Sequence, residues 1–140
     1  MYGKNLKTKL ADRANGCCEY CFCQSEFSPD PFVIDHIIPI AKGGSDDLEN
    51  LAYSCQGCNN HKYISTEAID PVSGTYVSLY HPRTHKWNEH FQWIKNYAQI
   101  FGKTPIGRAT VEKLKLNREG VVNLRRVLRR YGKHPVGVTL

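Results

Sequence analysis

The chain has 140 residues and a formal net charge of +6, and 41% of its residues are hydrophobic and 23% charged. This length and composition are typical of one folded domain and argue against a disordered chain or a fibre. No apolar run approaches the roughly 18 residues of a membrane span, and the first residues lack the apolar stretch of a signal peptide. We therefore expect a cytoplasmic, intracellular protein without a membrane partner.

Positive charge is concentrated toward the carboxyl end of the chain. Residues 1–102 carry nine basic and eleven acidic side chains, whereas residues 103–140 carry ten basic and two acidic ones. So dense a basic segment is typical of proteins that bind a polyanion, most often nucleic acid. The alternative is a basic helix face that contacts only water.

The chain begins with a predicted helix over residues 4–14. Leu6, Leu10 and Ala14 recur there at helical spacing, and Gly16 follows as a stop. We expect this helix to flank the core of the protein.

Four of the six cysteines form two closely spaced pairs. These CxxC pairs are Cys18 with Cys21 and Cys55 with Cys58. In a reducing compartment, cysteines bind metal more often than they form disulfides, and two such pairs offer the four thiolates of a tetrahedral zinc site. We therefore predict a structural Zn²⁺ ion. Cys17 and Cys23 are left over as buried thiols or bystanders, and Cys23 leaves the register of the first pair open.

A strand, a loop, a second strand and a helix are predicted around the second pair. Their ranges are 32–39 for the first strand, 41–50 for the glycine-rich loop, 51–54 for the second strand and 58–68 for the helix. The first strand is a β-branched run that we expect to be buried and to end at Pro39. Asp35 and His36 are neighbours on it, so their side chains should lie on opposite faces.

The order and spacing of these residues resemble the HNH endonuclease motif. The matching residues are Asp35-His36, Gly43-Gly44, Asn50-Leu51, Cys55, Cys58-Asn59 and Lys62. Members of this family carry the motif on a strand–loop–strand–helix unit called the ββα-metal fold, often braced by zinc between two CxxC pairs. The resemblance covers residues 17–62 closely. Residues 63–134 are similar, less specifically, to small stand-alone bacterial and phage HNH proteins.

The resemblance implies a fold class and a division of the chain. We expect an α+β fold in which a small ββα-metal core with a Cys₄ zinc site is flanked by the amino-terminal helix. Residues 1–102 would form this HNH nuclease core, and residues 103–140 would form a basic helical extension packed on the same domain.

The resemblance also assigns a role to each residue of the motif. Asp35 and Asn59 would hold one catalytic Mg²⁺ or Mn²⁺ ion, with His61 as the rival ligand to Asn59. Such an ion neutralises charge at phosphorus and stabilises the leaving oxygen. His36 would act as the general base, because an imidazole can accept a proton from water near neutral pH. Asn50 would order the loop that orients His36.

The segment after the motif is predicted to contain a strand and an apolar stripe. Residues 76–82 predict a strand that ends at a proline. Five apolar residues then alternate at spacings of four and three: Trp87, Phe91, Ile94, Ala98 and Phe101. We interpret them as the core-facing side of a helix. The alternatives are a strand over 93–101 and aromatic rings that stack on nucleic acid.

Two helices are predicted in the basic extension. Thr104 and Pro105 are typical of a helix start, and a second helix is expected between Asn117 and Gly132. Its apolar stripe comprises Val121, Leu124, Leu128 and Tyr131, and its arginines off that stripe are Arg125, Arg126, Arg129 and Arg130. We expect these arginines to contact the DNA backbone. Lys62 is a further phosphate contact, unless it is an ordinary exposed helix lysine.

We therefore predict a bacterial or phage-encoded, metal-dependent HNH endonuclease that hydrolyses phosphodiester bonds of DNA without a small-molecule cofactor. The alternative is a non-catalytic, zinc-dependent module that only binds nucleic acid. The joint presence of Asp35, His36 and Asn59 argues against that alternative, since binding alone does not need them. A third hypothesis treats the basic helix as a docking segment for an acidic partner. The oligomeric state is left open.

Overall fold

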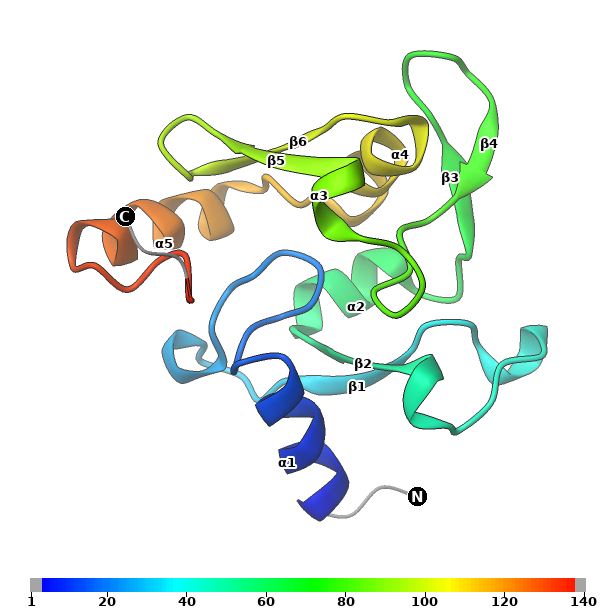
Figure 1. The fold of residues 1–140 in the computed structure, drawn as a ribbon, viewed down its shortest axis with the longest axis horizontal. Coiled ribbons are helices and arrows are strands. Elements are labelled where there is room, and N and C mark those ends of the chain that lie inside the picture. Colours follow the sequence, from blue (N-terminus) through cyan, green and yellow to red (C-terminus); the bar gives the residue numbers. More distant parts are fainter. Residues whose placement is uncertain (1–3, 138–140) are drawn as a thin grey trace.

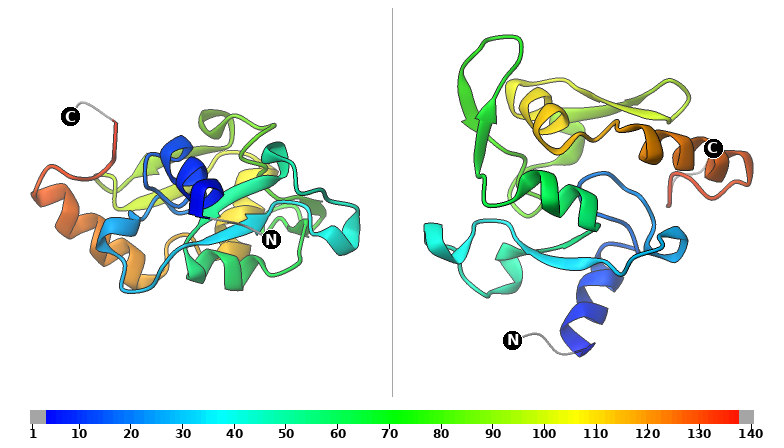
Figure 2. Two further views of the ribbon diagram at one scale, coloured as in Figure 1. Left: turned by 90° about the horizontal axis from the view of Figure 1, so that it is seen from below. Right: turned by 180° about the vertical axis from the view of Figure 1, so that it is seen from behind.

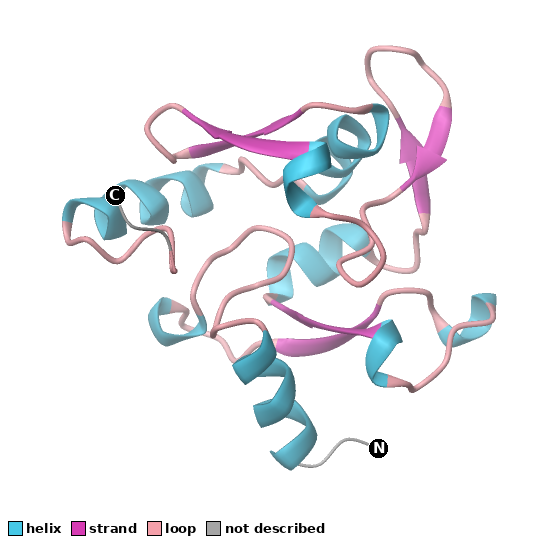
Figure 3. Cartoon of the chain, in the orientation of Figure 1, coloured by secondary structure: helices cyan, strands magenta, loops and turns pink. Residues whose placement is uncertain are grey.

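The computed structural model describes residues 4–137, apart from the side chain of Lys4. Residues 1–3 of the predicted core and residues 138–140 of the predicted basic extension lie outside the described part. The helices are α1 (Lys4–Arg13), α2 (Gln56–Lys62), α3 (Trp87–His90), α4 (Pro105–Leu114) and α5 (Glu119–Arg130). The strands are β1 (Val33–His36), β2 (Leu51–Ser54), β3 (Glu67–Ile69), β4 (Tyr76–Ser78), β5 (Phe91–Ile94) and β6 (Gln99–Gly102). The strands pair in sequence order as three antiparallel two-stranded sheets. The predicted α+β class is confirmed (Figure 1, Figure 3).

The strand–loop–strand–helix unit forms as predicted, although its helix is shorter. β1 pairs with β2 so that Asp35 lies opposite Ala52, and α2 begins directly after β2. Tyr63 then adopts φ 51° and ψ −125°, which lies outside the helical region and ends α2. The prediction of a helix to residue 68 is therefore wrong, because residues 67–69 form β3 instead.

Residues 87–102 form a hairpin rather than the predicted helix. α3 has one turn and ends at His90, after which β5 and β6 pair with each other. The alternative prediction, a strand over residues 93–101, is closer to this hairpin than the predicted helix is. The hairpin turn consists of Lys95, Asn96 and Tyr97, which all have left-handed φ values of 55°, 55° and 64°. Phe91 and Ala98 are buried as predicted, whereas Phe101 is 49% exposed, so helical spacing identified only part of the core here.

Helix α4 occupies the centre of the second half of the chain. It contacts β3, β4, β6, α2 and α3 (Figure 1). Thr104 caps it as predicted, since its Oγ1 accepts a hydrogen bond from Gly107 N at 3.0 Å. A Cβ atom at Gly107 would lie 2.0 Å from the carbonyl oxygen of His90. Only glycine therefore allows α4 to pack this closely against the end of α3.

Helix α5 and the β3–β4 hairpin lie at opposite ends of the molecule (Figure 1, Figure 2). Arg118 rather than Asn117 directly precedes α5, and the Asn117 side chain bonds both backbone groups of Ile100 in β6. Val121 and Leu128 are buried, but Tyr131 is 74% exposed because α5 has already ended. The predicted stripe is thus correct in its middle and wrong at its carboxyl end.

A single cluster of buried apolar residues connects both halves of the chain. It includes Leu10 of α1, Phe32 before β1, Leu51 of β2, and Ala109 and Leu114 of α4. Within residues 4–137, no helix is long and apolar enough to cross a bilayer. Residues 17–24 form a knuckle that contributes Cys18, Tyr20 and Cys21 to this core and bonds to β2 through Glu19 N and Tyr53 O.

Candidate functional site

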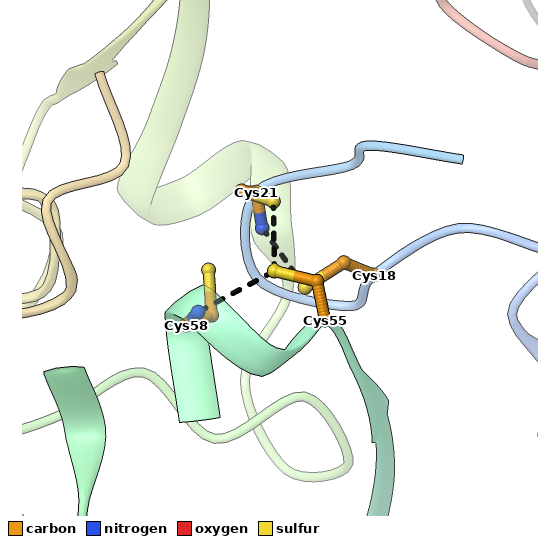
Figure 4. Close-up of side chains that lie close together, drawn as sticks. All are labelled: Cys18, Cys21, Cys55 and Cys58. Carbon is orange, nitrogen blue, oxygen red and sulfur yellow. Dashed lines mark hydrogen bonds between the residues drawn. The ribbon is translucent and has the colours of Figure 1, made fainter. Parts of the chain in front are cut away.

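Four buried cysteines meet where the knuckle, β2 and α2 come together (Figure 4). This cysteine cluster comprises Cys18, Cys21, Cys55 and Cys58, whose Sγ atoms all lie within 4.8 Å of one another. The Sγ atoms of Cys21 and Cys55 are 3.7 Å apart. A tetrahedron with zinc–sulfur distances of about 2.3 Å has edges of roughly 3.8 Å. The cluster therefore has the donor set and spacing of a site that could hold zinc.

The two remaining cysteines take different positions. Cys17 Sγ lies 3.6 Å from the backbone oxygen of Asn15, and burial raises the pKa of the Cys17 thiol to about 11. Cys23 Sγ lies 3.3 Å from Cys21 Sγ, at the margin of the cysteine cluster. The four sulfurs that meet are those of the two CxxC pairs, so Cys18 and Cys21 form the first pair.

Arg118 supplies positive charge to the cysteine cluster. Its guanidinium nitrogens lie 3.3 Å from Cys55 Sγ and 3.5 Å from Cys58 Sγ. Burial alone would lower the pKa of Arg118, but the thiolates of Cys58 and Cys21 raise it above its ordinary value. Four thiolates around one Zn²⁺ ion leave a net negative charge, which this guanidinium offsets. The sequence analysis missed Arg118, because nothing in its spacing relates it to cysteines 60 residues away.

Arg125 is a structural residue, and the prediction that it contacts DNA is wrong. Its side chain is 2% exposed. The guanidinium donates hydrogen bonds to the carbonyl oxygens of Leu116 at 2.7 Å, Cys21 at 2.9 Å and Ala98 at 3.0 Å. It thereby ties α5 to the knuckle and the β5–β6 hairpin. The other three predicted arginines are exposed or half-buried on α5: Arg126, Arg129 and Arg130.

Asp35 is buried in a network with Tyr20 and Lys62. Its carboxylate is 4% exposed and accepts a hydrogen bond from the Tyr20 hydroxyl at 2.6 Å. Lys62 Nζ lies 3.2 Å from the same carboxylate and also donates to the carbonyl oxygen of Ile37 at 2.9 Å. Burial raises the pKa of Asp35, while the Lys62 ammonium and the Tyr20 hydroxyl act in the opposite direction.

This network changes the role expected for Lys62. Its side chain is 1% exposed, so the prediction of a phosphate contact at the surface is wrong. Lys62 instead joins the end of α2 to the end of β1 through Asp35 and two backbone carbonyls. Tyr20, which lies inside the first CxxC pair, was also missed by the sequence analysis.

His36 lies on the opposite face of β1 and contacts an acidic side chain. Its Nε2 is 2.8 Å from Asp46 Oδ1, and the imidazole is 23% exposed against 65% for the Asp46 carboxylate. The pair therefore combines a ring held in one orientation with access from solvent. Asp46 was not singled out from the sequence, where the only signal is an acidic residue in the loop after His36.

Asn50 holds the loop between β1 and β2 in a closed shape. Its Oδ1 accepts from Ile38 N at 2.9 Å, and its Nδ2 donates to the carbonyl oxygens of Ile38 at 2.9 Å and Ser45 at 2.8 Å. A Cβ at Gly44 would lie 1.7 Å from Ile38 O, so only glycine permits this closure. The loop carries Asp46, and Asn50 thereby helps to position the partner of His36.

The two rival ligands for the catalytic ion, Asn59 and His61, both lie on α2. Asn59 is half-buried and His61 is exposed. Within the described part of the chain, neither side chain forms a hydrogen bond with Asp35. Close by, a cavity of about 330 Å³ is lined by residues that include Ile37, Lys62 and His81. The motif residues thus surround β1, with Asp35 on its buried face and His36 on its accessible face.

Comparison with known proteins defines the class of this region. Residues 18–63 match the family model of HNH endonucleases, which confirms the resemblance found from the motif. The matched stretch contains the cysteine cluster, Asp35, His36, Asn50 and all of α2. Residues 18–63 are therefore similar to an HNH endonuclease domain.

One similar protein is the Type IV methyl-directed restriction enzyme EcoKMcrA of Escherichia coli strain K12. The two proteins are 26% identical over 78 residues, which cover 53% of this chain. The chain spans about 28% of the length of that relative. No solved structure matches the chain.

Proposed function

We propose that this protein is a metal-dependent endonuclease that hydrolyses phosphodiester bonds of DNA. The observation that carries the proposal is the His36–Asp46 contact of 2.8 Å on the accessible face of β1, inside a matched HNH domain. A nuclease of this type needs a base beside the scissile phosphate and a scaffold that holds it. The cysteine cluster, whose spacing suits zinc, and the loop closed by Asn50 provide the scaffold that holds the base.

His36 is proposed as the general base. It accepts the proton of the attacking water, whose oxygen forms the new bond to phosphorus while the bond from phosphorus to the leaving oxygen of the DNA strand breaks. The Asp46 carboxylate orients the imidazole and stabilises the imidazolium that forms, because an opposite charge at hydrogen-bond distance favours the charged ring. Asn50 contributes indirectly, since it fixes the loop from which Asp46 projects.

Asp35 and Asn59 are proposed to hold a divalent cation, with His61 as the rival to Asn59. Hard cations such as Mg²⁺ and Mn²⁺ prefer carboxylate and amide oxygens. A carboxylate offers about four lone-pair positions. Tyr20 and Lys62 use some of these positions at Asp35, and the cation would take another. A cation held there would offset the negative charge that develops around phosphorus and on the leaving oxygen.

DNA is the proposed substrate because HNH endonuclease is the matched family and because α5 carries exposed arginines. Methyl-directed restriction describes the whole EcoKMcrA protein, of whose length this chain spans 28%. We therefore extend only DNA cleavage to this chain. A cytoplasmic location is proposed with it, since thiolate ligands require reduced cysteines.

The test is nicking of supercoiled plasmid by the zinc-loaded chain, with and without added Mg²⁺ or Mn²⁺. The proposal expects nicked circles only with the divalent ion, and none from a preparation of His36→Ala made in parallel. Binding of plasmid without nicking under every metal condition would overturn the proposal and favour the non-catalytic nucleic-acid-binding module.

A further inference from the structure

A groove lined by aromatic rings lies on the β5–β6 hairpin, and no residue of the HNH motif lines it. Its volume is about 390 Å³. Its rings are those of Trp87, Phe91, Trp93 and Tyr97. The ring centroids of Trp87 and Trp93 are 5.6 Å apart, and those of Trp93 and Tyr97 are 6.2 Å apart. We call this cavity the aromatic groove.

Polar side chains, most of them carboxamides, also line the aromatic groove. Asn88, Gln92 and Asn96 place carboxamides along the aromatic groove, and Lys103 adds a positive charge. Carboxamides both donate and accept hydrogen bonds, as the edges of nucleobases do. Trp87 also keeps a buried Nε1–H that has no hydrogen-bond partner among the described residues.

A second, basic cavity adjoins the aromatic groove. It measures about 440 Å³ and is lined by Lys95, Asn96, Arg126, Arg129 and Arg130. Asn96 lines both cavities. Arg129 connects them further, since its guanidinium lies 4.3 Å from the centre of the Tyr97 ring and its Nε donates to Asn96 Oδ1 at 3.0 Å. Among the described residues, no acidic side chain lines either cavity.

The turn that separates the two cavities has a conformation that costs free energy. Lys95, Asn96 and Tyr97 are three consecutive non-glycine residues with left-handed φ values. Such residues persist where the surrounding structure holds them, and they gather at functional sites. Here the turn directs Asn96 and Tyr97 toward the aromatic groove and Lys95 toward the basic cavity.

We propose that the two cavities together bind an unpaired nucleotide segment of DNA. One base stacks on the rings of the aromatic groove, and its edge meets the carboxamides of Asn88, Gln92 and Asn96. The neighbouring phosphates lie in the basic cavity against Lys95, Arg126 and Arg130. Stacking requires a base whose face is free, so the ligand is single-stranded or locally opened DNA rather than an intact duplex. The proposal rests on DNA as the substrate of the proposed nuclease.

Intrinsic fluorescence provides a direct test. The chain has two tryptophans, and both line the aromatic groove. The zinc-loaded full chain, without Mg²⁺ or Mn²⁺, is titrated with an oligothymidylate octamer and with an abasic octamer of the same length and charge. We expect saturable quenching by the first and little quenching by the second. We expect the abasic strand to bind about 10-fold more weakly or worse, because base–aromatic stacking contributes this much per base. Equal affinity without quenching would overturn the proposal.

A charge-matched pair of variants locates the site. Lys103→Glu places a negative charge in the aromatic groove, whereas Lys113→Glu makes the same change on α4 outside both cavities. We expect the first variant to weaken octamer binding about 5–10-fold and the second to change it less than 2-fold. Equal effects would show that general charge, rather than this groove, determines affinity.

The outcome is separable from that of the nuclease. Quenching needs neither divalent ion nor cleavage, so quenching by a chain that fails to nick plasmid would support the groove and reject the nuclease. Nicking without quenching would support the nuclease and reject the groove.

Discussion

The two faces of β1 use adjacent residues for different purposes. On the buried face, Asp35 is surrounded by Tyr20 and Lys62, and all three side chains are nearly inaccessible to solvent. On the other face, His36 meets Asp46 at the surface, in a loop that Asn50 closes. The buried face holds the strand to the knuckle and to α2, whereas the accessible face presents a titratable ring. Side-chain alternation along one strand thus places a buried ion-pair network and an accessible imidazole at adjacent residues.

The largest expected effect comes from removing a thiolate that supports the buried face. Cys55→Ser should lose zinc and unfold at a much lower temperature than the unmodified chain. Thiolate zinc sites contribute on the order of 10 kcal/mol in small domains. Elemental analysis and thermal denaturation measure both losses. Cys23→Ser is the control and should keep one zinc ion, since its sulfur lies outside the set of four that meet. One zinc ion retained by Cys55→Ser would contradict the assignment.

Removal of the accessible ring should affect catalysis and leave the fold intact. His36→Ala should lower the plasmid-nicking rate by ~10²–10⁴-fold, the usual effect of losing a general base. The unfolding midpoint in urea and the zinc content should remain those of the unmodified chain. Wild-type nicking by this variant, in a preparation free of other nucleases, would identify a different base.

Lys62 tests the buried face by itself. Lys62→Met leaves the Asp35 carboxylate without its ammonium partner, and removing one member of a buried ion pair costs about 3–5 kcal/mol. Urea denaturation of the zinc-loaded chain measures this loss. The double variant Asp35→Asn with Lys62→Met should recover part of it, because no uncompensated charge remains. A loss of equal size in the double variant would show that packing, rather than charge, is responsible.

The smallest effect is expected at Asp46. Asp46→Asn keeps a hydrogen-bond acceptor but removes the charge beside His36, and an exposed ion pair contributes up to about 1 kcal/mol. Nicking should slow about 10-fold or less, and the free energy of unfolding should fall by no more than about 1 kcal/mol. A loss as large as that of His36→Ala would mean that the carboxylate itself touches the reacting atoms.

The sequence predicted the motif well because its residues are constrained at short range. The paired cysteines, Asp35, His36 and the glycines of the loop lie within about 40 residues of one another, and their chemistry fixes their spacing. The strand–loop–strand–helix order and the cysteine cluster follow from that spacing. The contact between His36 and Asp46 does not follow from that spacing, because the loop contains several acidic residues and the sequence pattern does not distinguish among them.

Residues far apart in the chain escaped prediction because tertiary contacts decide their environment. Arg125 lies four residues after Val121, on the buried side of α5, but charged residues are rarely buried and it was therefore assigned to the surface. Lys62 was misjudged for the same reason. The left-handed turn over 95–97 contains no glycine, so nothing in its composition indicated a hairpin.

The arginine contacts with the knuckle also determine when this protein completes folding. Cys21 comes early in the chain, but its carbonyl oxygen bonds to Arg125, 104 residues later. During synthesis, the knuckle can gather its first two thiols long before α5 exists. The carbonyl oxygen of Cys21 therefore lacks this partner until α5 has been made, because contacts of such long sequence separation form late. The bond that joins the knuckle to α5 is thus one of the last contacts that a newly made chain can form.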